Sequence, residues 1–278
     1  MATTSYNSTP NLSIKVGGVA YAYRDLGSRM GVPLVLFNHW GAVLDDYDPA
    51  IVDALARSRR VIATNYRGVG ASGGQVRASV EEMARDAIDL IRALGFDSVD
   101  LFGFSLGGMV AQDIALRAPE LVRRLILVGT GPAGGKGIGK FGAVPWILVR
   151  GFLTMQDPKH HLFFPNTPDG QREAKDFVAR IKERTVDRDQ GPRISSYYRQ
   201  LQAITAWGQR APQDLGRIKI PVLITNGDND IMVPTENSVD MAHRIPQAQL
   251  VIYENAGHGG HFQCHEDFVA TVLPFLEE

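Results

Sequence analysis

The stretch VDLFGFSLGGMVAQDIALR, residues 99–117, decides the fold, because a short buried strand meets a helical pattern at one serine. Ser98–Phe102 is typical of a strand buried on both faces, and Leu106–Arg117 of a helix that ends before a proline. Gly103 and Gly107 lie two residues before and two after Ser105, where a sharp strand-to-helix turn needs small residues. The free N–H groups of the helix N-terminus would face negative charge that develops at the serine. The stretch therefore predicts a nucleophilic Ser105.

The same Gly-x-Ser-x-Gly pattern occurs a second time at residues 70–74, around Ser72. No strand leads directly into Ser72, and no helical pattern begins before Ser79. The context therefore predicts that Ser72 is a turn residue in a glycine-rich loop, and that Ser105 is the reactive serine.

Outward from residues 99–117, short apolar runs alternate with longer amphipathic stretches. The runs predict strands at Leu12–Val16, Val19–Leu26, Pro33–Phe37, Arg60–Thr64, Ser98–Phe102, Arg124–Val128, Pro221–Thr225 and Gln249–Tyr253. The amphipathic stretches predict helices at Pro49–Ala56, Ser79–Leu94, Leu106–Arg117, Thr235–Arg244 and Phe268–Leu276. This alternation favours an α/β fold with a mostly parallel sheet that is covered by helices on both faces.

The alternation stops between about Gly131 and Ala211. This segment begins with a glycine-rich stretch and contains helical patterns near Gln171–Thr185 and Ser195–Trp207, but no convincing buried strand. We therefore predict a core formed by residues 1–132 and 212–278. Residues 133–211 are predicted to form a helical cap over the active edge of the sheet.

A serine hydroxyl needs a base, and the base needs a carboxylate that orients it. The carboxylate should follow a strand, and Asp228 and Asp230 both follow Pro221–Thr225. Asp230 is favoured because it lies three residues before Val233-Pro234, whereas Asp228 fits an Asx turn that holds the loop.

The base should be a histidine that follows the last strand. His258 lies five residues after Tyr253, between glycines that let the imidazole approach the serine. His261 and His265 fall at the start of the next helix and are interpreted as surface or capping residues.

An oxyanion hole needs backbone N–H donors. One is expected from Leu106, the residue after the nucleophile, and the other from Trp40 in the loop after Pro33–Phe37. His39 in this loop is an alternative catalytic residue, but it is interpreted as holding the loop by hydrogen bonds.

The composition excludes several other classes of protein. A formal net charge of −1 gives no reason to expect nucleic acid as a partner, and one cysteine excludes an internal disulfide. A dinucleotide pattern at residues 129–134 contains Pro132 and opens no helix, and His160-His161 lacks partners at metal-ligand spacing. No cofactor or metal is expected.

Without a signal sequence or a long apolar run, no membrane association is expected, and the expected location is cytoplasmic. The oligomeric state stays open.

Five motifs in the expected order resemble the α/β-hydrolase superfamily along almost the whole chain. They are Leu36-Phe37-Asn38-His39-Trp40-Gly41, Asn65-Tyr66-Arg67-Gly68-Val69-Gly70-Ala71-Ser72, Gly103-Phe104-Ser105-Leu106-Gly107-Gly108, Gly227-x-x-Asp230-x-x-Val233-Pro234 and Ala256-Gly257-His258. The resemblance implies an eight-stranded sheet, a cap between the sixth and seventh strands, and the triad Ser105, Asp230 and His258. Many members carry His-Gly where this chain has Asn38-His39, which puts substrate preference in question.

The resulting expectation is hydrolysis of a carboxylic ester or lactone of a small, largely apolar molecule through an acyl-Ser105 intermediate. Alternatives with the same triad are cofactor-free perhydrolysis (haloperoxidase activity), C–C bond hydrolysis and, with less support, iminopeptidase activity. A slowly reacting small-molecule receptor is an alternative from another class. The pocket is expected to involve Trp40, Phe104 and the aromatic residues of the cap, namely Phe141, Trp146, Phe152, Phe163, Phe164 and Trp207.

Overall fold

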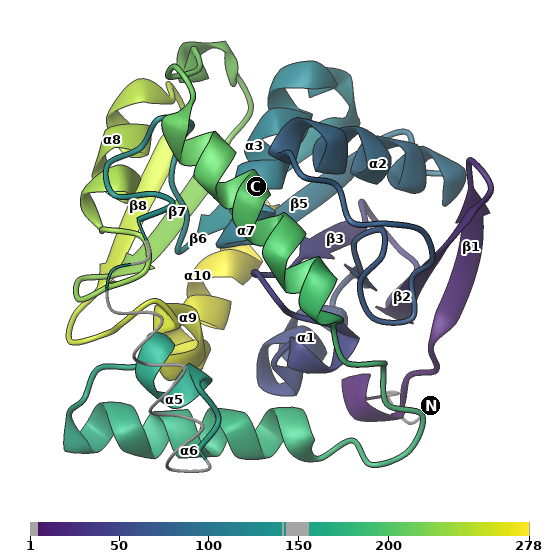
Figure 1. The fold of residues 1–278 in the computed structure, drawn as a ribbon, viewed down its shortest axis with the longest axis horizontal. Coiled ribbons are helices and arrows are strands. Elements are labelled where there is room, and N and C mark those ends of the chain that lie inside the picture. Colours follow the sequence, from purple (N-terminus) through teal and green to yellow (C-terminus); the bar gives the residue numbers. More distant parts are fainter. Residues whose placement is uncertain (1–4, 141, 143–155, 278) are drawn as a thin grey trace.

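A twisted, mostly parallel sheet forms the centre of the molecule (Figure 1). The structure, a computed structural model, describes residues 5–140, 142 and 156–277. Eight strands lie in the order β1-β2-β4-β3-β5-β6-β7-β8, in which β2 is antiparallel to β1 and β4 and all other neighbours are parallel. The strands are β1 (Leu12–Val16), β2 (Val19–Gly27), β3 (Leu34–Phe37), β4 (Arg60–Thr64), β5 (Val99–Phe104), β6 (Val122–Val128), β7 (Val222–Gly227) and β8 (Ala248–Tyr253). The predicted α/β class is confirmed.

Helices connect the parallel strands, and some of them begin at a side chain that caps the helix. Asp48 accepts a hydrogen bond from the backbone N–H of Ala50 at the start of α1, and Ser79 accepts one from that of Glu82 at the start of α2. The helices are α1 (Pro49–Ala56), α2 (Val80–Ala93), α3 (Leu106–Arg117), α5 (Lys159–Leu162), α6 (Pro168–Lys182), α7 (Ile194–Gln209), α8 (Glu236–Arg244), α9 (Gly260–Gln263) and α10 (His265–Glu277).

Both faces of the central strands β3, β4, β5, β6 and β7 are buried, and successive side chains of a strand point to opposite faces. In β3, Val35 and Phe37 join a core that includes residues of α2, α3 and α8. Leu34 and Leu36 of the same strand join a second core with residues of α1, α6 and α10. Because these strands are parallel, their carboxyl ends lie at one common edge of the sheet, where loops from distant parts of the sequence meet.

The segment between β6 and β7 contains α5, α6 and α7, and its described part contains no strand. In Figure 1, α7 crosses in front of the sheet, and α6 lies below it beside α5 and α9. The C-terminal half of α7 contributes Ala203, Ile204 and Trp207 to the core on the α2 and α3 side. The helices agree with the predicted helical insertion, and the proposed boundary of a separate cap at residue 133 stays a prediction.

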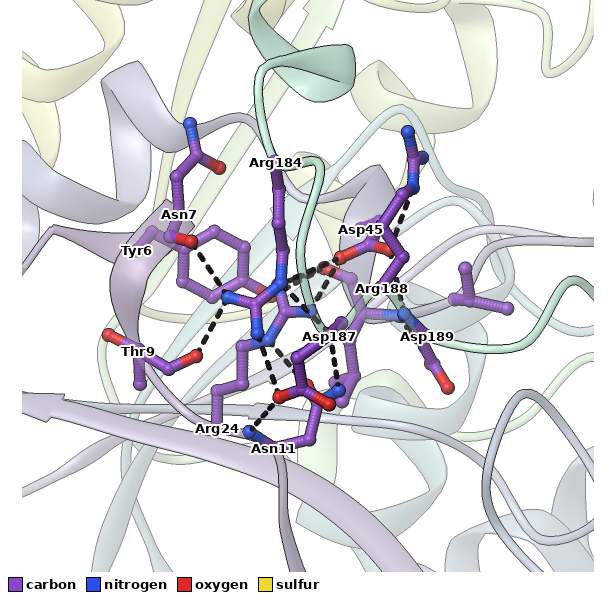
Figure 2. A network of polar contacts seen from close by, with 12 residues as sticks. Tyr6, Asn7, Thr9, Asn11, Arg24, Asp45, Arg184, Asp187, Arg188 and Asp189 are labelled. Carbon is purple, nitrogen blue, oxygen red and sulfur yellow. Dashed lines mark hydrogen bonds and ion pairs between the residues drawn. The ribbon is translucent and has the colours of Figure 1, made fainter.

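A buried polar network fastens the connection between α6 and α7 to the N-terminal part of the chain (Figure 2). Asp45 forms ion pairs with Arg24, Arg184 and Arg188 and accepts a hydrogen bond of 2.8 Å from the backbone N–H of Asp189. Arg184 in turn donates hydrogen bonds of 2.8 Å to the carbonyl oxygens of Asn7 and Thr9. The path of the insertion over the sheet therefore depends on contacts between segments that are far apart in the sequence.

Replacing Asp45 with asparagine is expected to lower the free energy of unfolding by about 3–5 kcal/mol, because a buried guanidinium loses its counter-charge. The side chain of Arg24 is 0% exposed and that of Asp45 is 3% exposed, so water cannot compensate for the loss. Urea denaturation would measure the change. In the control Asp240→Asn, the carboxylate is 49% exposed and its partner Arg244 is partly solvated, so a loss below about 1 kcal/mol is expected. Equal losses for the two variants would contradict the assigned role of Asp45.

Candidate active site

Ser105 occupies a strained turn between β5 and α3. Its backbone angles are φ 55° and ψ −114°, a conformation that non-glycine residues rarely adopt. The backbone N–H of Ser105 donates to the carbonyl oxygen of Val128 at 2.9 Å, and its carbonyl oxygen accepts from Thr130 Oγ1 at 2.8 Å. The neighbouring strand β6 and the residues after it thus hold the turn, which is the strand–serine–helix geometry that the sequence predicts.

The two glycines that flank Ser105 lie where the backbone leaves no room for a side chain. A Cβ atom on Gly103 would come within 2.4 Å of the carbonyl oxygen of Gly107. A Cβ atom on Gly107 would come within 2.1 Å of the carbonyl oxygen of Phe37 at the end of β3. The glycines therefore allow the first turn of α3 to pack closely against β3 and β5.

Asp230 and His258 form a buried pair at the ends of β7 and β8. The distance between His258 Nδ1 and Asp230 Oδ2 is 2.7 Å, and the two side chains are 1% and 0% exposed. The other oxygen, Asp230 Oδ1, accepts hydrogen bonds from the backbone N–H groups of Met232 at 2.7 Å and Val233 at 2.9 Å. A carboxylate held in this way orients the imidazole with its proton on Nδ1, which leaves Nε2 as the basic atom.

The loop that carries His258 is held by the insertion. The backbone N–H of Gly259 donates to the carbonyl oxygen of Phe163 at 2.8 Å, and the Phe163 ring lies 5.6 Å from the imidazole. The Phe104 ring lies 5.0 Å from the imidazole and 5.6 Å from the Phe163 ring. The three rings thus pack against one another, so β5 and the end of α5 both help to position the imidazole.

The alternative residues lie apart from this arrangement. Asp228 is exposed, and its carboxylate accepts from Asn229 Nδ2 at 2.7 Å and from the backbone N–H of Ala256 at 3.1 Å, so it braces the loop. Ser72 Oγ accepts from the backbone N–H of Ala22 at 2.9 Å, far from the end of β5 in the fold. The interpretation of His261 as a surface or capping residue was wrong, since it is 2% exposed. Its ring packs against Phe104 and Phe262, because the short helix α9 turns it inward.

The loop after β3 is braced from both sides. His39 Nδ1 donates to the carbonyl oxygen of Trp40 at 2.8 Å, and burial lowers the pKa of His39 to about 4, so the imidazole is neutral. Trp40 Nε1 donates to the carbonyl oxygen of Tyr197 at 2.8 Å, and the Gly41 N–H donates to Gln200 Oε1 at 2.8 Å. Helix α7 therefore positions the loop from which an oxyanion donor was predicted at Trp40.

The other predicted oxyanion donor is the backbone N–H of Leu106. Leu106 is the first residue of α3, and the N–H groups in the first turn of a helix have no acceptor within that helix.

Ser105 and His258 face a common cavity of about 340 Å³, a volume typical of sites for small molecules. Its described wall combines apolar and polar side chains from the loops after β3, β5, β7 and β8, from α5 and the residues beside it, and from α7. The lining residues are His39, Trp40, Gly41, Ser105, Asp157, Pro158, Lys159, Leu162, Phe163, Tyr197, Met232 and His258.

Only some of the residues that were predicted to line the pocket line the cavity in the structure. Trp40 and Phe163 line the cavity, and Phe104 lies behind it against His258. Phe164 is instead buried beside Phe177, with ring centroids 5.7 Å apart. Trp207 is buried between α7 and the core, where its Nε1 donates to the carbonyl oxygen of Gly131 at 3.1 Å. Phe141, Trp146 and Phe152 lie outside the described residues.

The sequence interpretation missed Asp157, Lys159, Leu162, Tyr197 and Met232 as cavity residues. None of them is a defining position of a motif. Asp157, Lys159, Leu162 and Tyr197 line the cavity through the placement of the insertion, and Met232 lines it from the loop after β7. Across the described ranges, three or more His, Cys, Asp or Glu side chains nowhere gather as a metal would require. Within the same ranges, no helix has both the length and the apolar character needed to span a bilayer.

His261 makes stability depend on pH. Burial, and then the nearby His258 and His39, lower the pKa of His261 well below its ordinary value, so the folded protein resists protonation there. The unfolded chain takes up this proton at about pH 6.5. Unfolding is therefore favoured as pH falls below about 6.5, and the stability is present above that pH. In the variant His261→Leu, the decline in unfolding free energy between pH 7 and pH 5 is expected to be smaller, as measured by urea denaturation.

The control for this pH dependence is Phe268→Leu, which loosens packing in the same cluster without removing a titratable group. It should lower stability by a similar amount at every pH. If His261→Leu lost stability towards acid as steeply as the wild type, the buried imidazole would not be a source of the pH dependence.

Comparisons with known proteins find the same fold in other proteins. Residues 32–263 match the model of a family described as having the alpha/beta hydrolase fold. The solved structure of an alpha/beta hydrolase fold protein from Chitinophaga pinensis is 35% identical, with a TM-score of 0.92 and 99% of each chain covered. An enol-lactonase from Burkholderia xenovorans LB400 is 25% identical, with a TM-score of 0.77, over 96% of this chain and 100% of that one.

Among curated relatives, the pimeloyl-[acyl-carrier protein] methyl ester esterase of Nitrosomonas europaea is 28% identical over 86% of this chain and 94% of its own length. RutD of Agrobacterium fabrum, named as a candidate carbamate hydrolase, is 27% identical over 81% of this chain and 85% of its own length. The names of these relatives state different substrates, but both names describe hydrolytic enzymes.

Proposed function

The chain belongs to the α/β-hydrolase family, and on this basis we propose that it hydrolyses a carboxylic ester or lactone through an acyl-Ser105 intermediate. The observation that carries the proposal is the convergence of three loops. Ser105 in its strained turn and His258, held by Asp230, line one cavity together with Trp40. The proposed partner is a small-molecule substrate, and the proposed reaction uses no cofactor.

In the proposed mechanism, His258 Nε2 takes the proton of Ser105 as Oγ attacks the ester carbonyl carbon. The negative charge that forms on the carbonyl oxygen is stabilised by the backbone N–H groups of Leu106 and Trp40. His258 then gives its proton to the leaving alkoxide, and the acyl group stays on Ser105. A water molecule, deprotonated by His258, attacks the acyl carbon, and His258 returns the proton to Ser105 Oγ as the bond to the acyl group breaks and the acid is released. Asp230 stays ionised throughout and stabilises the imidazolium.

The nature of the cavity favours esters and lactones of modest size. Trp40, Leu162, Phe163 and Met232 give it an apolar surface that suits an alkyl or aryl acyl group. The related esterase and enol-lactonase act on bonds of this kind, as their names state. A carbamate, named for the RutD relative, offers its carbonyl group to the same triad.

The test is hydrolysis of p-nitrophenyl esters from acetate to octanoate and of a matched series of lactones from five- to seven-membered rings. We expect turnover of at least one series, with kcat/KM rising with chain length and then falling once the acyl group exceeds the cavity. A fluorophosphonate probe should also label the protein at Ser105, as mass spectrometry of the peptide would show. Absence of turnover on all these substrates and on p-nitrophenyl carbamates, together with absence of labelling, would overturn the proposal.

A further inference from the structure

Besides His39, which braces the loop after β3, three polar side chains in the described cavity wall have no part in the proposed triad or oxyanion hole. They are Asp157 and Lys159, at the start of α5, and Tyr197 on α7. All three come from the insertion between β6 and β7, whereas Ser105 and His258 come from the ends of core strands. A largely apolar cavity that contains a few polar groups uses them to orient its ligand.

The charge of Lys159 is balanced within the protein. Its Nζ lies 3.0 Å from Asp46 Oδ1 and 3.5 Å from Asp157 Oδ1. Burial alone would lower the pKa of Lys159, but the carboxylates of Asp46 and Asp157 outweigh burial and raise it above its ordinary value. Burial alone would raise the pKa of Asp46, but the charge of Lys159 together with hydrogen bonds from Lys159 and the Val43 N–H holds this pKa below its ordinary value. The ammonium group therefore keeps its charge and its counter-ions.

The hydroxyl of Tyr197 stays protonated for a related reason. Burial and then the charge of Asp46 raise the pKa of Tyr197, so its O–H remains a hydrogen-bond donor at neutral pH. The rest of this side chain is fixed, because its ring packs edge-on against Trp40 at 5.6 Å. The wall thus presents donors from Lys159 and Tyr197 and an acceptor from Asp157.

This combination favours a group that both donates and accepts hydrogen bonds and carries no charge. A substrate carboxylate would meet the carboxylate of Asp157, with Asp46 already paired to Lys159, and an ammonium group would meet Lys159; both are like-charge contacts in a partly desolvated site. A hydroxyl can donate to Asp157 and accept from Lys159 or Tyr197. We infer that Asp157, Lys159 and Tyr197 form a subsite that binds an uncharged hydroxyl group of the substrate, at a distance from its scissile carbonyl. The inference rests on the proposed ester hydrolysis and narrows its substrate class to hydroxylated esters or lactones.

The probes are p-nitrophenyl esters matched in length. Butyrate and hexanoate are the plain esters, 3-hydroxybutyrate and 6-hydroxyhexanoate carry the hydroxyl, and the monoesters of succinate and adipate carry a carboxylate. We expect kcat/KM for a hydroxylated ester to exceed that for its plain counterpart by at least about tenfold, because the hydroxyl forms hydrogen bonds to charged partners in a partly desolvated site. The anionic esters are expected to react more slowly than the plain ones.

The variants are Tyr197→Phe and Asp157→Asn, with Tyr198→Phe as the matched control. Tyr197→Phe keeps the ring against Trp40 and the carbonyl oxygen that accepts from Trp40 Nε1, so only the hydroxyl is lost. Tyr198 is the next residue of α7, is 62% exposed and does not line the cavity. Both subsite variants are expected to reduce the preference for the hydroxylated ester by about fivefold to tenfold, and the control is expected to preserve it.

Equal kcat/KM values of the wild type for plain and hydroxylated esters of both lengths would overturn the inference and leave the proposed esterase function standing. A preference for the anionic esters, or equal effects of Tyr197→Phe and Tyr198→Phe on the ratio, would overturn it as well. Failure of the wild type to hydrolyse any of the esters would instead overturn the proposed function, and the subsite with it.

Discussion

Replacing Ser105 with alanine is expected to lower kcat/KM for p-nitrophenyl butyrate by at least about 10⁴-fold, to the level supported by the remaining groups of the site. Without Oγ the acyl enzyme cannot form, and the Asp230–His258 pair has no nucleophile to activate. A steady-state assay at matched protein concentrations measures the loss. Because Ser105 has φ 55° and alanine tolerates that angle no better than serine, circular dichroism and urea denaturation should accompany the assay.

The control is Ser72→Ala in the second Gly-x-Ser-x-Gly sequence. Ser72 is 7% exposed, and its hydroxyl holds the backbone N–H of Ala22 at 2.9 Å. The alanine variant should lose about 1 kcal/mol of stability and keep its activity within a few-fold. If Ser105→Ala retained activity while Ser72→Ala lost it, the assignment of the nucleophile would be reversed.

The core of this fold could be predicted from sequence because its signals are local. Each central strand is a short apolar run, and helices such as α1 and α2 begin at capping residues that the sequence displays. The turn at Ser105 is defined by glycines within two residues of it, and these glycines lie where a Cβ would collide with Phe37 or Gly107. Asp230 and His258 follow strands that end at the same edge of the sheet, so topology alone brings them together.

The pocket could not be predicted in the same way, because its wall depends on contacts between distant segments. The amphipathic pattern of α7 shows that one face is buried, but it does not show that Trp207 faces the core while Tyr197 faces the cavity. That difference follows from how α7 crosses the sheet, which the Asp45 network and the bond between Gly41 and Gln200 determine. Lys159 lines the cavity because Asp46, more than a hundred residues earlier, pairs with it.

The burial of His261 could not be predicted from the sequence, for a related reason. A histidine at a helix start is usually a surface or capping residue, but α9 is only one turn long and lies over the sheet edge. There the imidazole fills a space among Phe102, Phe104 and Phe268. Burial in such surroundings depends on which side chains converge from β5, α9 and α10, and a single sequence does not display that convergence.

Replacing Asp230 with asparagine is expected to lower kcat/KM by about 10³–10⁴-fold while leaving the fold intact. Asp230 uses both oxygens, one toward the backbone N–H groups of Met232 and Val233 and the other toward His258 Nδ1. Asparagine has one oxygen, and the two N–H donors require it to face them. Its NH₂ group then points at His258 Nδ1, which must accept rather than donate. The imidazole proton moves to Nε2, and the nitrogen nearest to the nucleophile can no longer take the serine proton.

The neighbouring Asp228→Asn variant separates this effect from a general disturbance of the loop. Asp228 lies two residues away, is exposed, and among the described residues accepts from Asn229 and Ala256, both at Oδ1, which an amide oxygen can also satisfy. It should keep kcat/KM within a few-fold of the wild type. Should Asp230→Asn lose less than tenfold, or Asp228→Asn lose as much, His258 would not depend on Asp230 for its tautomer. If the two variants differ as expected and unfold at the same urea concentration as the wild type, the loss belongs to proton transfer, because the substitution changes only the direction of one hydrogen bond and the charge that stabilises the imidazolium.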